Sequence, residues 1–175
     1  AGAGADDITL NSATDVNTIK YTATTAAQMV TESGAATGDV DFSATVAGDE
    51  INTWSSTTDL IHFDADLLTN EDGTSTDTLK SINTGGIVAA TDRFVELTAH
   101  FNGTTEAAIA ALDALVTADV EIGDSFIAIM QTSTDQYLYL VDQVSASNTI
   151  SAQDVTLVGQ IAAIADVQDG NFATY

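Results

Sequence analysis

The chain has 175 residues, enough for one ordinary domain, and carries 26 acidic residues against three basic ones, for a net charge of −23. Hydrophobic residues still make up 45% of it, so its composition favours a folded domain over a disordered acidic tail. The charge excludes nucleic-acid binding through phosphate neutralisation and argues against attachment to an anionic membrane surface. No apolar run approaches the roughly 18 residues of a spanning helix, so no membrane insertion is expected.

The acidic residues themselves point to cations. Twenty of them are Asp, whose short carboxylate suits tight oxygen-ligand loops. Because three basic residues cannot neutralise them, the folded chain either tolerates self-repulsion, as a salt-adapted surface would, or binds metal ions. Cysteine is absent, which excludes disulfides and thiolate metal sites and makes Ca²⁺ the expected staple of an extracellular domain.

Hydrophobic periodicity and turn residues predict the elements of the first half of the chain. In chain order these are a strand at 18–22, a short helix at about 24–33 that stops at Gly34, strands separated by Gly-Asp turns within 38–54, a buried strand at 59–63, and a polar loop at 69–77.

The second half is predicted in the same way, and no composition break divides the chain. We expect a strand at 94–101, a helix at about 104–118, a hairpin of 125–131 with 137–141, a strand at 154–158, and a polar end with Phe172 and Tyr175 as isolated aromatics. The prediction is a single mainly β domain over 1–175, a β-sandwich or β-roll-like fold with one or two short helices.

A weak repeat links two parts of the sequence. Gly48-Asp49 opens one predicted strand and Thr58-Asp59 opens the next, and Gly123-Asp124 and Thr134-Asp135 do the same later in the chain. We interpret both copies as β-hairpins with Gly-Asp and Thr-Asp turns.

The first nine residues, AGAGADDIT, match the Ca²⁺-binding β-roll nonapeptide G-G-x-G-x-D-x-U-x at every position but the first. Glycines allow the tight turn, and Asp6 supplies a carboxylate. One copy cannot complete a site, because each ion lies between successive turns. The predicted ligands are Gly2, Gly4, Asp6 and Asp7, and the alternative is a flexible Gly/Ala segment.

This motif, with residues 48–54 (GDEINTW) and 58–63 (TDLIHF), resembles the C-terminal region of RTX-type proteins exported by type I secretion, a group that includes bacterial surface-layer proteins. The resemblance implies Ca²⁺ as cofactor and a location outside the cell or at its surface. It also implies that residues 1–10 correspond to the last turn of a calcium-binding β-roll.

A second candidate site surrounds the Asp72-Gly73 turn, where Asn70, Asp72 and Asp77 resemble an oxygen-ligand loop without EF-hand spacing. The alternative is a solvated loop. Asp64 and Asp66, which follow a predicted strand, are equally consistent with ligands and with an exposed strand end.

Catalysis is not expected. His62 and His100 both lie in apolar strand contexts, which are more typical of packed core histidines than of catalysts. The chain has no G-x-S-x-G, H-E-x-x-H, P-loop or dinucleotide-binding motif.

The sequence therefore predicts a structural, Ca²⁺-stabilised extracellular domain that assembles with copies of itself, and with other surface components, at a cell surface. Its apolar strands at 59–63, 125–131 and 137–141 are expected to leave sheet edges that pair with another copy. The alternative function is a C-terminal secretion and calcium-binding module of a larger secreted enzyme or adhesin.

Overall fold

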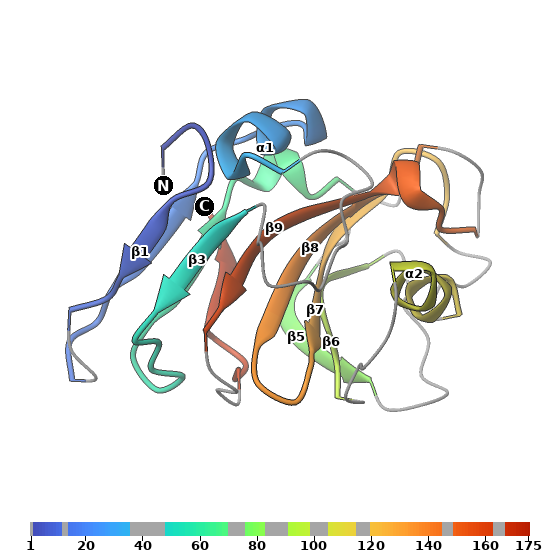
Figure 1. Cartoon of the computed structure of the whole chain (residues 1–175). Coiled ribbons are helices and arrows are strands. Elements are labelled where there is room, and N and C mark those ends of the chain that lie inside the picture. The colour runs from blue at the N-terminus through green and yellow to red at the C-terminus, as the bar shows by residue number, and fades with distance from the viewer. Residues whose placement is uncertain are drawn as a thin grey trace.

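A computed structural model describes residues 2–11, 14–35, 48–69, 76–82, 91–98, 105–114, 120–144, 149–162 and 167–175 (Figure 1). The strands are β1 (Asp7–Thr9), β2 (Thr18–Tyr21), β3 (Asp49–Asn52), β4 (Leu60–Phe63), β5 (Thr76–Ile82), β6 (Asp92–Leu97), β7 (Ser125–Gln131), β8 (Gln136–Asp142), β9 (Val155–Ile161) and β10 (Phe172–Thr174). The helices are α1 (Ala26–Ser33) and α2 (Thr105–Asp113), with 3₁₀ turns at Ala65–Leu67 and Ala152–Asp154. The predicted mainly β fold with short helices is confirmed.

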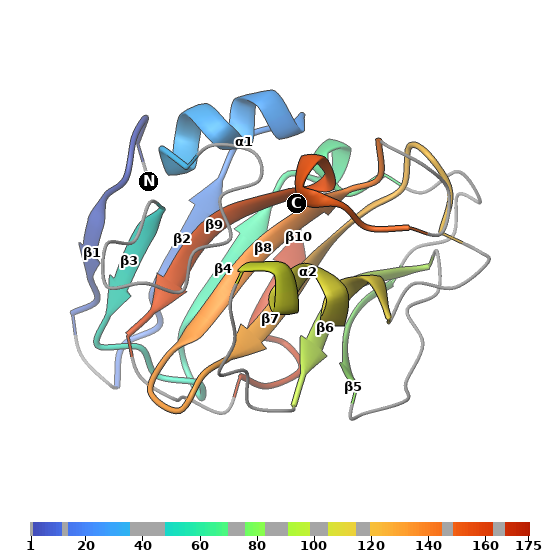
Figure 2. The ribbon, with the colours of Figure 1, turned by 45° about the vertical axis from the view of Figure 1, so that its right-hand side comes forward.

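The strands form two sheets. Sheet A has seven strands in the order β1-β3-β9-β8-β7-β6-β5, and sheet B has three in the order β10-β4-β2. All neighbours are parallel except β7 with β8 and β8 with β9, which are antiparallel. In Figure 2 both sheets run across the molecule from β1 and β2 on one side towards β5 and β10 on the other.

Consecutive strands alternate between the two sheets and build a coil. The pairs β1–β2, β3–β4 and β9–β10 each place one strand in sheet A and the next in sheet B, and successive pairs align in parallel. Ile8, Ile51 and Ile161 stand in register across sheet A. The segment between β4 and β9 adds the remaining four strands of sheet A. The β-roll-like arrangement therefore arises from residues far apart in the sequence.

Sheet A is buried on both faces along its central strands. One face packs against sheet B, and the other packs against a second cluster that includes Leu112 of α2. Every residue of β9 is buried, as are all but the last residues of β7 and β8, which explains their continuous apolar runs. The expectation that β4, β7 and β8 form sheet edges is wrong, because each lies between two neighbours.

A row of stacked aromatic rings fills the space between the sheets. Tyr21 stacks on Phe63 with ring centroids 5.1 Å apart, Phe94 lies 6.1 Å from Phe63, and Phe172 stacks on Phe94 at 5.6 Å. Phe172 is therefore a buried core residue of β10, and its prediction as an isolated aromatic is wrong. Strand β10 was not predicted, because it has three residues and lies among polar and acidic residues.

Local signals gave several elements correctly. Helix α1 begins after Thr25, whose hydroxyl accepts the N–H of Gln28, and ends at Gly34 with φ 74°. The predicted hairpin is confirmed as β7 and β8. The first Gly-Asp repeat is not a hairpin, because β3 lies in sheet A and β4 in sheet B.

Candidate functional site

The predicted nonapeptide is docked against the fold and does not project from it. The N–H of Gly2 donates to Asp6 Oδ2 at 2.7 Å, and the N–H of Gly4 donates to the carbonyl of Thr31 at the end of α1. Asp7 is exposed, and its Oδ1 accepts from Asn52 Nδ2 at 2.9 Å. Of the four predicted ligands here, the structure therefore brings Gly2 and Asp6 into direct contact.

Strand β1, which is formed by the last three residues of this motif, lies beside the equivalent strand β3 of the next coil. Asp7 is in register with Glu50 and Ile8 with Ile51, so Asp6 and Asp49 occupy the same position in adjacent coils. The backbone N–H of Asp6 donates to Asp49 Oδ1 at 2.9 Å. Sequence reasoning did not select Asp49 as a site residue. Its signal is visible in retrospect, since Gly48-Asp49-Glu50-Ile51 parallels Ala5-Asp6-Asp7-Ile8.

Several other buried aspartates have a clear structural role. Asp59 accepts from Asn17 Nδ2 and from the N–H of Ser55, and it directly precedes β4. Asp124 and Asp154 directly precede β7 and β9 and also accept backbone N–H groups. Part of the acidic excess therefore closes loops at strand starts, where its carboxylates accept backbone and amide N–H groups.

Asp49 differs because half of its carboxyl group is unsatisfied. The residue is fully buried, and neither Asp49 Oδ2 nor the hydroxyl of Tyr21 beside it makes a hydrogen bond of ordinary geometry. Burial raises the pKa of Asp49 from 3.8 to about 6; the Asp6 N–H and the Tyr21 hydroxyl, which donate towards its carboxyl group, act to lower it, and the charge of Asp6 adds to the rise. Burial and then the charges of Asp49, Glu32 and Asp6 raise the pKa of Tyr21 well above its ordinary value.

An open groove of about 470 Å³ lies next to this cluster, between the nonapeptide, the end of β2 and α1. The Glu32 carboxylate forms part of one wall and accepts hydrogen bonds from the N–H groups of Thr22 and Ala23. Its lining residues are Gly2, Ala3, Thr22, Ala23, Gln28, Thr31 and Glu32. Acidic and amide oxygens therefore face solvent where the first coil begins.

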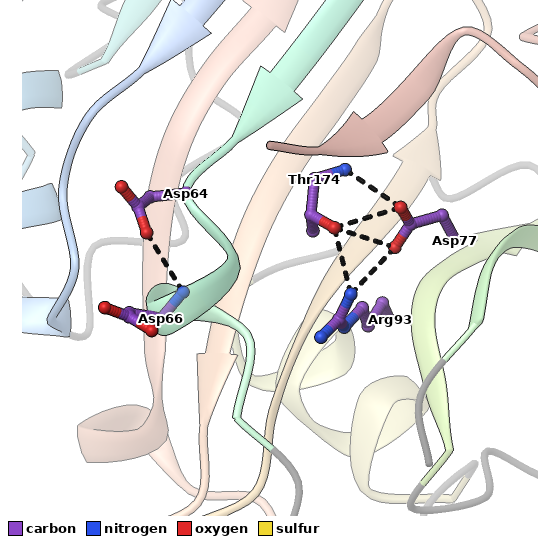
Figure 3. Close-up of polar contacts among 5 residues, drawn as sticks. All are labelled: Asp64, Asp66, Asp77, Arg93 and Thr174. Atoms are coloured by element: carbon purple, nitrogen blue, oxygen red, sulfur yellow. Dashed lines mark hydrogen bonds and ion pairs between the residues drawn. The ribbon is translucent and has the colours of Figure 1, made fainter. Parts of the chain in front are cut away.

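Asp77, the third member of the second predicted site, is part of a brace between strands (Figure 3). Its Oδ1 accepts from Arg93 Nη1 at 3.0 Å, and its Oδ2 accepts from the N–H of Thr174 at 3.1 Å. Burial acts to raise the pKa of Asp77, but the hydrogen bonds from Thr174 and Arg93 outweigh it and lower the pKa below its ordinary value. Asn70 and Asp72 lie outside the described residues.

Asp64 and Asp66 form a local turn at the end of β4 (Figure 3). Asp64 Oδ1 accepts the N–H of Asp66 at 3.0 Å and so caps the 3₁₀ turn Ala65–Leu67. This contact is the one expected of an Asp at a helix start. It favours the strand-end reading over the ligand reading for Asp64.

His62 lies on the outer face of sheet B. The inward residues of β4 are Ile61 and Phe63, which are fully buried, whereas His62 is only partly buried and stands in register with Lys20. The expectation of a core histidine is therefore wrong for His62. His100 lies outside the described residues.

Within the described ranges, no three His, Asp or Glu side chains come close enough together to hold a metal ion. No described helix has the length and apolar character needed to cross a bilayer. Comparison of the chain with protein-family models, curated proteins and solved structures finds no match. Its function is therefore inferred from its own residues and their geometry.

Proposed function

We propose that this chain is a structural domain that Ca²⁺ stabilises and that associates with copies of itself outside the cell, at a cell surface. The observation that carries the proposal is the stacked pair of Asp6 and Asp49, in which the fully buried carboxyl group of Asp49 has only a distorted contact with the Tyr21 hydroxyl at Oδ2 among the described residues. A β-roll ion lies between successive turns, and Asp49 gives the nonapeptide the second turn that its sequence lacks.

Electrostatics support a cation at this position. At a pH above about 6, the pKa of Asp49, its buried carboxyl group is ionised, and the acidic residue Asp6 lies at the equivalent position of the adjacent coil. A divalent cation beside them would offset both their repulsion and the cost of burying the charge of Asp49. Because two carboxylates do not fill the coordination shell of Ca²⁺, the remaining ligands would be carbonyl, hydroxyl and water oxygens, which Ca²⁺ accepts in flexible geometry.

The expected energies suit an extracellular structural site. Extracellular Ca²⁺ modules have dissociation constants of about 10⁻⁴–10⁻³ M. At a free concentration about ten times the dissociation constant, each site stabilises the fold by about 1.4 kcal/mol. For a domain whose unfolding free energy is about 5–15 kcal/mol, a few such sites change the folded fraction decisively.

Isothermal titration calorimetry of the metal-stripped chain tests the calcium part of the proposal. We expect saturable Ca²⁺ binding in the submillimolar to millimolar range and much weaker heat from Mg²⁺, which demands stricter geometry. No saturable Ca²⁺ heat at neutral pH would contradict it.

The outer edge of β1 favours a second candidate function. Strand β1 is parallel to β3, and no described strand pairs with its other side. That edge has the direction and spacing that a further parallel coil requires. The chain would then act as the C-terminal calcium-binding and secretion module of a larger secreted enzyme or adhesin, and a monomeric but Ca²⁺-dependent domain would favour this candidate.

A further inference from the structure

The end of the coil that carries β1 and β2 is open in both sheets. Strand β1 is the outermost strand of sheet A and β2 the outermost strand of sheet B, and both lie toward the same side of the molecule (Figures 1 and 2). No described strand pairs with the outer side of either one. We call these two strands and the exposed Val16 before β2 the open end.

The opposite end is closed by side chains. Asp169 Oδ1 accepts the N–H of Leu79 on the outer strand β5, and Asp77 of β5 accepts from both the N–H and the hydroxyl of Thr174 on β10. These contacts join the last strands of the two sheets to each other. Among the described residues no comparable side-chain contact joins β1 to β2, so at the open end another chain can add to both sheets.

The two edges of the open end carry opposite charges. Asp7 and Thr9 are exposed on β1, whereas Thr18 and Lys20 are exposed on β2. Lys20 lies over the ring of Tyr175, 4.7 Å from its centroid, and has no carboxylate partner among the described residues. The other two basic residues of the chain are engaged in ion pairs, Lys80 with Asp92 and Arg93 with Asp77.

We propose that the open end binds a second copy of this chain, with β1 of each copy pairing with β2 of the other; this inference rests on the self-association proposed above. In Figure 2 the strands of the first coil run in opposite directions in the two sheets. A two-fold axis parallel to the strands and midway between the sheets keeps strand directions unchanged. It therefore brings β1 against β2 of the second copy as an antiparallel pair.

One register of this strand pair places apolar residues opposite each other on the inner face and complementary polar residues opposite each other on the outer face. Placing Asp7 opposite Lys20 of the second copy places Ile8 opposite Ile19 and Thr9 opposite Thr18. Ile8 and Ile19 already face the core between the sheets, so they would extend it across the interface. The charged and threonine pairs would lie together on the outer surface, and opposite charges and Thr–Thr pairs facing each other across strands are favourable.

The local complementarity of Asp7 and Lys20, and not the net charge, is the reason for choosing a second copy as the occupant. Two chains of net charge −23 repel each other, so association needs contacts of opposite sign at the interface. The two-fold arrangement supplies the Asp7–Lys20 contact twice. It also brings both copies of Val16, which is 68% exposed, to the boundary of the interface.

A charge-swap experiment tests the interface by sedimentation in millimolar Ca²⁺. Asp7→Lys alone and Lys20→Glu alone each create two like-charged pairs, and each is expected to weaken association roughly ten-fold or more. An equimolar mixture of the two variants forms a mixed dimer in which both pairs are again opposite in charge. We expect the mixture to regain the association of the unmodified chain, with circular dichroism confirming that each variant is folded.

Cross-linking provides a second measurement, because the chain has no native cysteine. A mixture of Thr9→Cys and Thr18→Cys is expected to form a disulfide-linked dimer under mild oxidation, whereas each variant alone forms little.

The outcomes separate this inference from the proposed function. Association that neither charge variant changes, or a mixture that neither associates nor cross-links, overturns the interface and leaves self-association standing. An unmodified chain that stays monomeric at high concentration, with and without Ca²⁺, overturns both.

Discussion

Asp49 Oδ1 accepts the backbone N–H of Asp6 at 2.9 Å, although 43 positions separate the two residues in the chain. The contact docks the nonapeptide onto the second coil and places two carboxyl groups at equivalent positions of neighbouring strands. This hydrogen bond helps to hold the glycine-rich segment against the fold, where its last three residues form the outer strand of sheet A. The stability of that contact, its dependence on pH and its response to cations can each be measured.

Replacing Asp49 by Asn is expected to stabilise the metal-free chain at pH 7.5. The folded-state pKa of Asp49, about 6, lies above the ordinary 3.8, so its contribution is fully present below pH 3.8 and is lost as pH rises through 6. The resulting loss of unfolding free energy is about 3 kcal/mol. Asn cannot ionise, so the variant avoids this loss, and its side-chain oxygen still accepts the N–H of Asp6. Urea unfolding of both chains at pH 4 and 7.5 measures the difference.

Exposed Asp15→Asn is the control for this substitution, because it removes the same charge without burial. It should change the unfolding free energy by no more than about 0.5 kcal/mol at either pH. Equal effects of the two substitutions would mean that Asp49 acts only through net charge.

Asp6→Ala should lower Ca²⁺ affinity while the central strands stay folded. Asp6 directly precedes the outermost strand β1 and contacts Gly2 through its side chain, so its loss leaves the aromatic core intact. Calorimetry reports the affinity, and far-UV circular dichroism reports the fold. An unchanged number of ions bound with unchanged affinity would remove Asp6 from the calcium site.

Asp77→Ala is expected to destabilise the chain by about 1–3 kcal/mol, because it leaves the Arg93 guanidinium without its carboxylate and the Thr174 N–H without its acceptor, although Arg93 Nη1 still donates to the Thr174 hydroxyl. The pKa of Asp77 is lowered, so this contribution is present above the ordinary pKa of an Asp and disappears as the solution is acidified through the lower folded-state pKa. Urea unfolding at pH 7 and at pH 2 checks the direction. If Asp77→Ala instead reduces the number of bound Ca²⁺ ions, the ligand role predicted from sequence is correct.

Gly34→Ala tests how tightly the nonapeptide packs against α1. Gly34 has φ 74°, and a Cβ there would lie 2.4 Å from the backbone nitrogen of Ala5. Gly170, with φ 97°, has open space at the same position, so Gly170→Ala carries the backbone strain alone. We expect Gly170→Ala to cost about 1 kcal/mol in thermal unfolding and Gly34→Ala clearly more. Equal costs would mean that the nonapeptide does not dock there.

The elements that sequence predicts best are those with local signals. Gly34 marks the end of α1, and the two apolar runs at 125–131 and 137–141, joined by a polar turn, indicate the β7–β8 hairpin. The parallel coil could not be predicted in the same way, because its pairs join residues dozens of positions apart and all of its strands except β9 have only three or four residues. Strand β10 has too few residues for a recognisable period, and β5 begins within the predicted polar loop 69–77.

The candidate site was half visible in the sequence. The nonapeptide predicts Asp6 as a ligand. Its stacked neighbour Asp49 lies in a Gly-Asp pattern that resembles Gly123-Asp124 more visibly than it resembles the nonapeptide. The better match to residues 5–8 spans four residues, too short to stand out in a chain so rich in Asp. The register between β1 and β3 identifies Asp49 as the neighbour of Asp6, which the short sequence repeat alone could not do.

Circular dichroism during a Ca²⁺ titration of the metal-stripped chain, in low salt at pH 7.5, tests the central claim most directly. The 26 acidic residues then lack counter-charge, so the chelated chain should lose or loosen its β structure and recover it as Ca²⁺ reaches the millimolar range. High NaCl without Ca²⁺ should restore the structure only in part, since screening reduces repulsion but does not provide coordination. Full β structure and an unchanged urea midpoint in excess chelator at low salt would contradict the account.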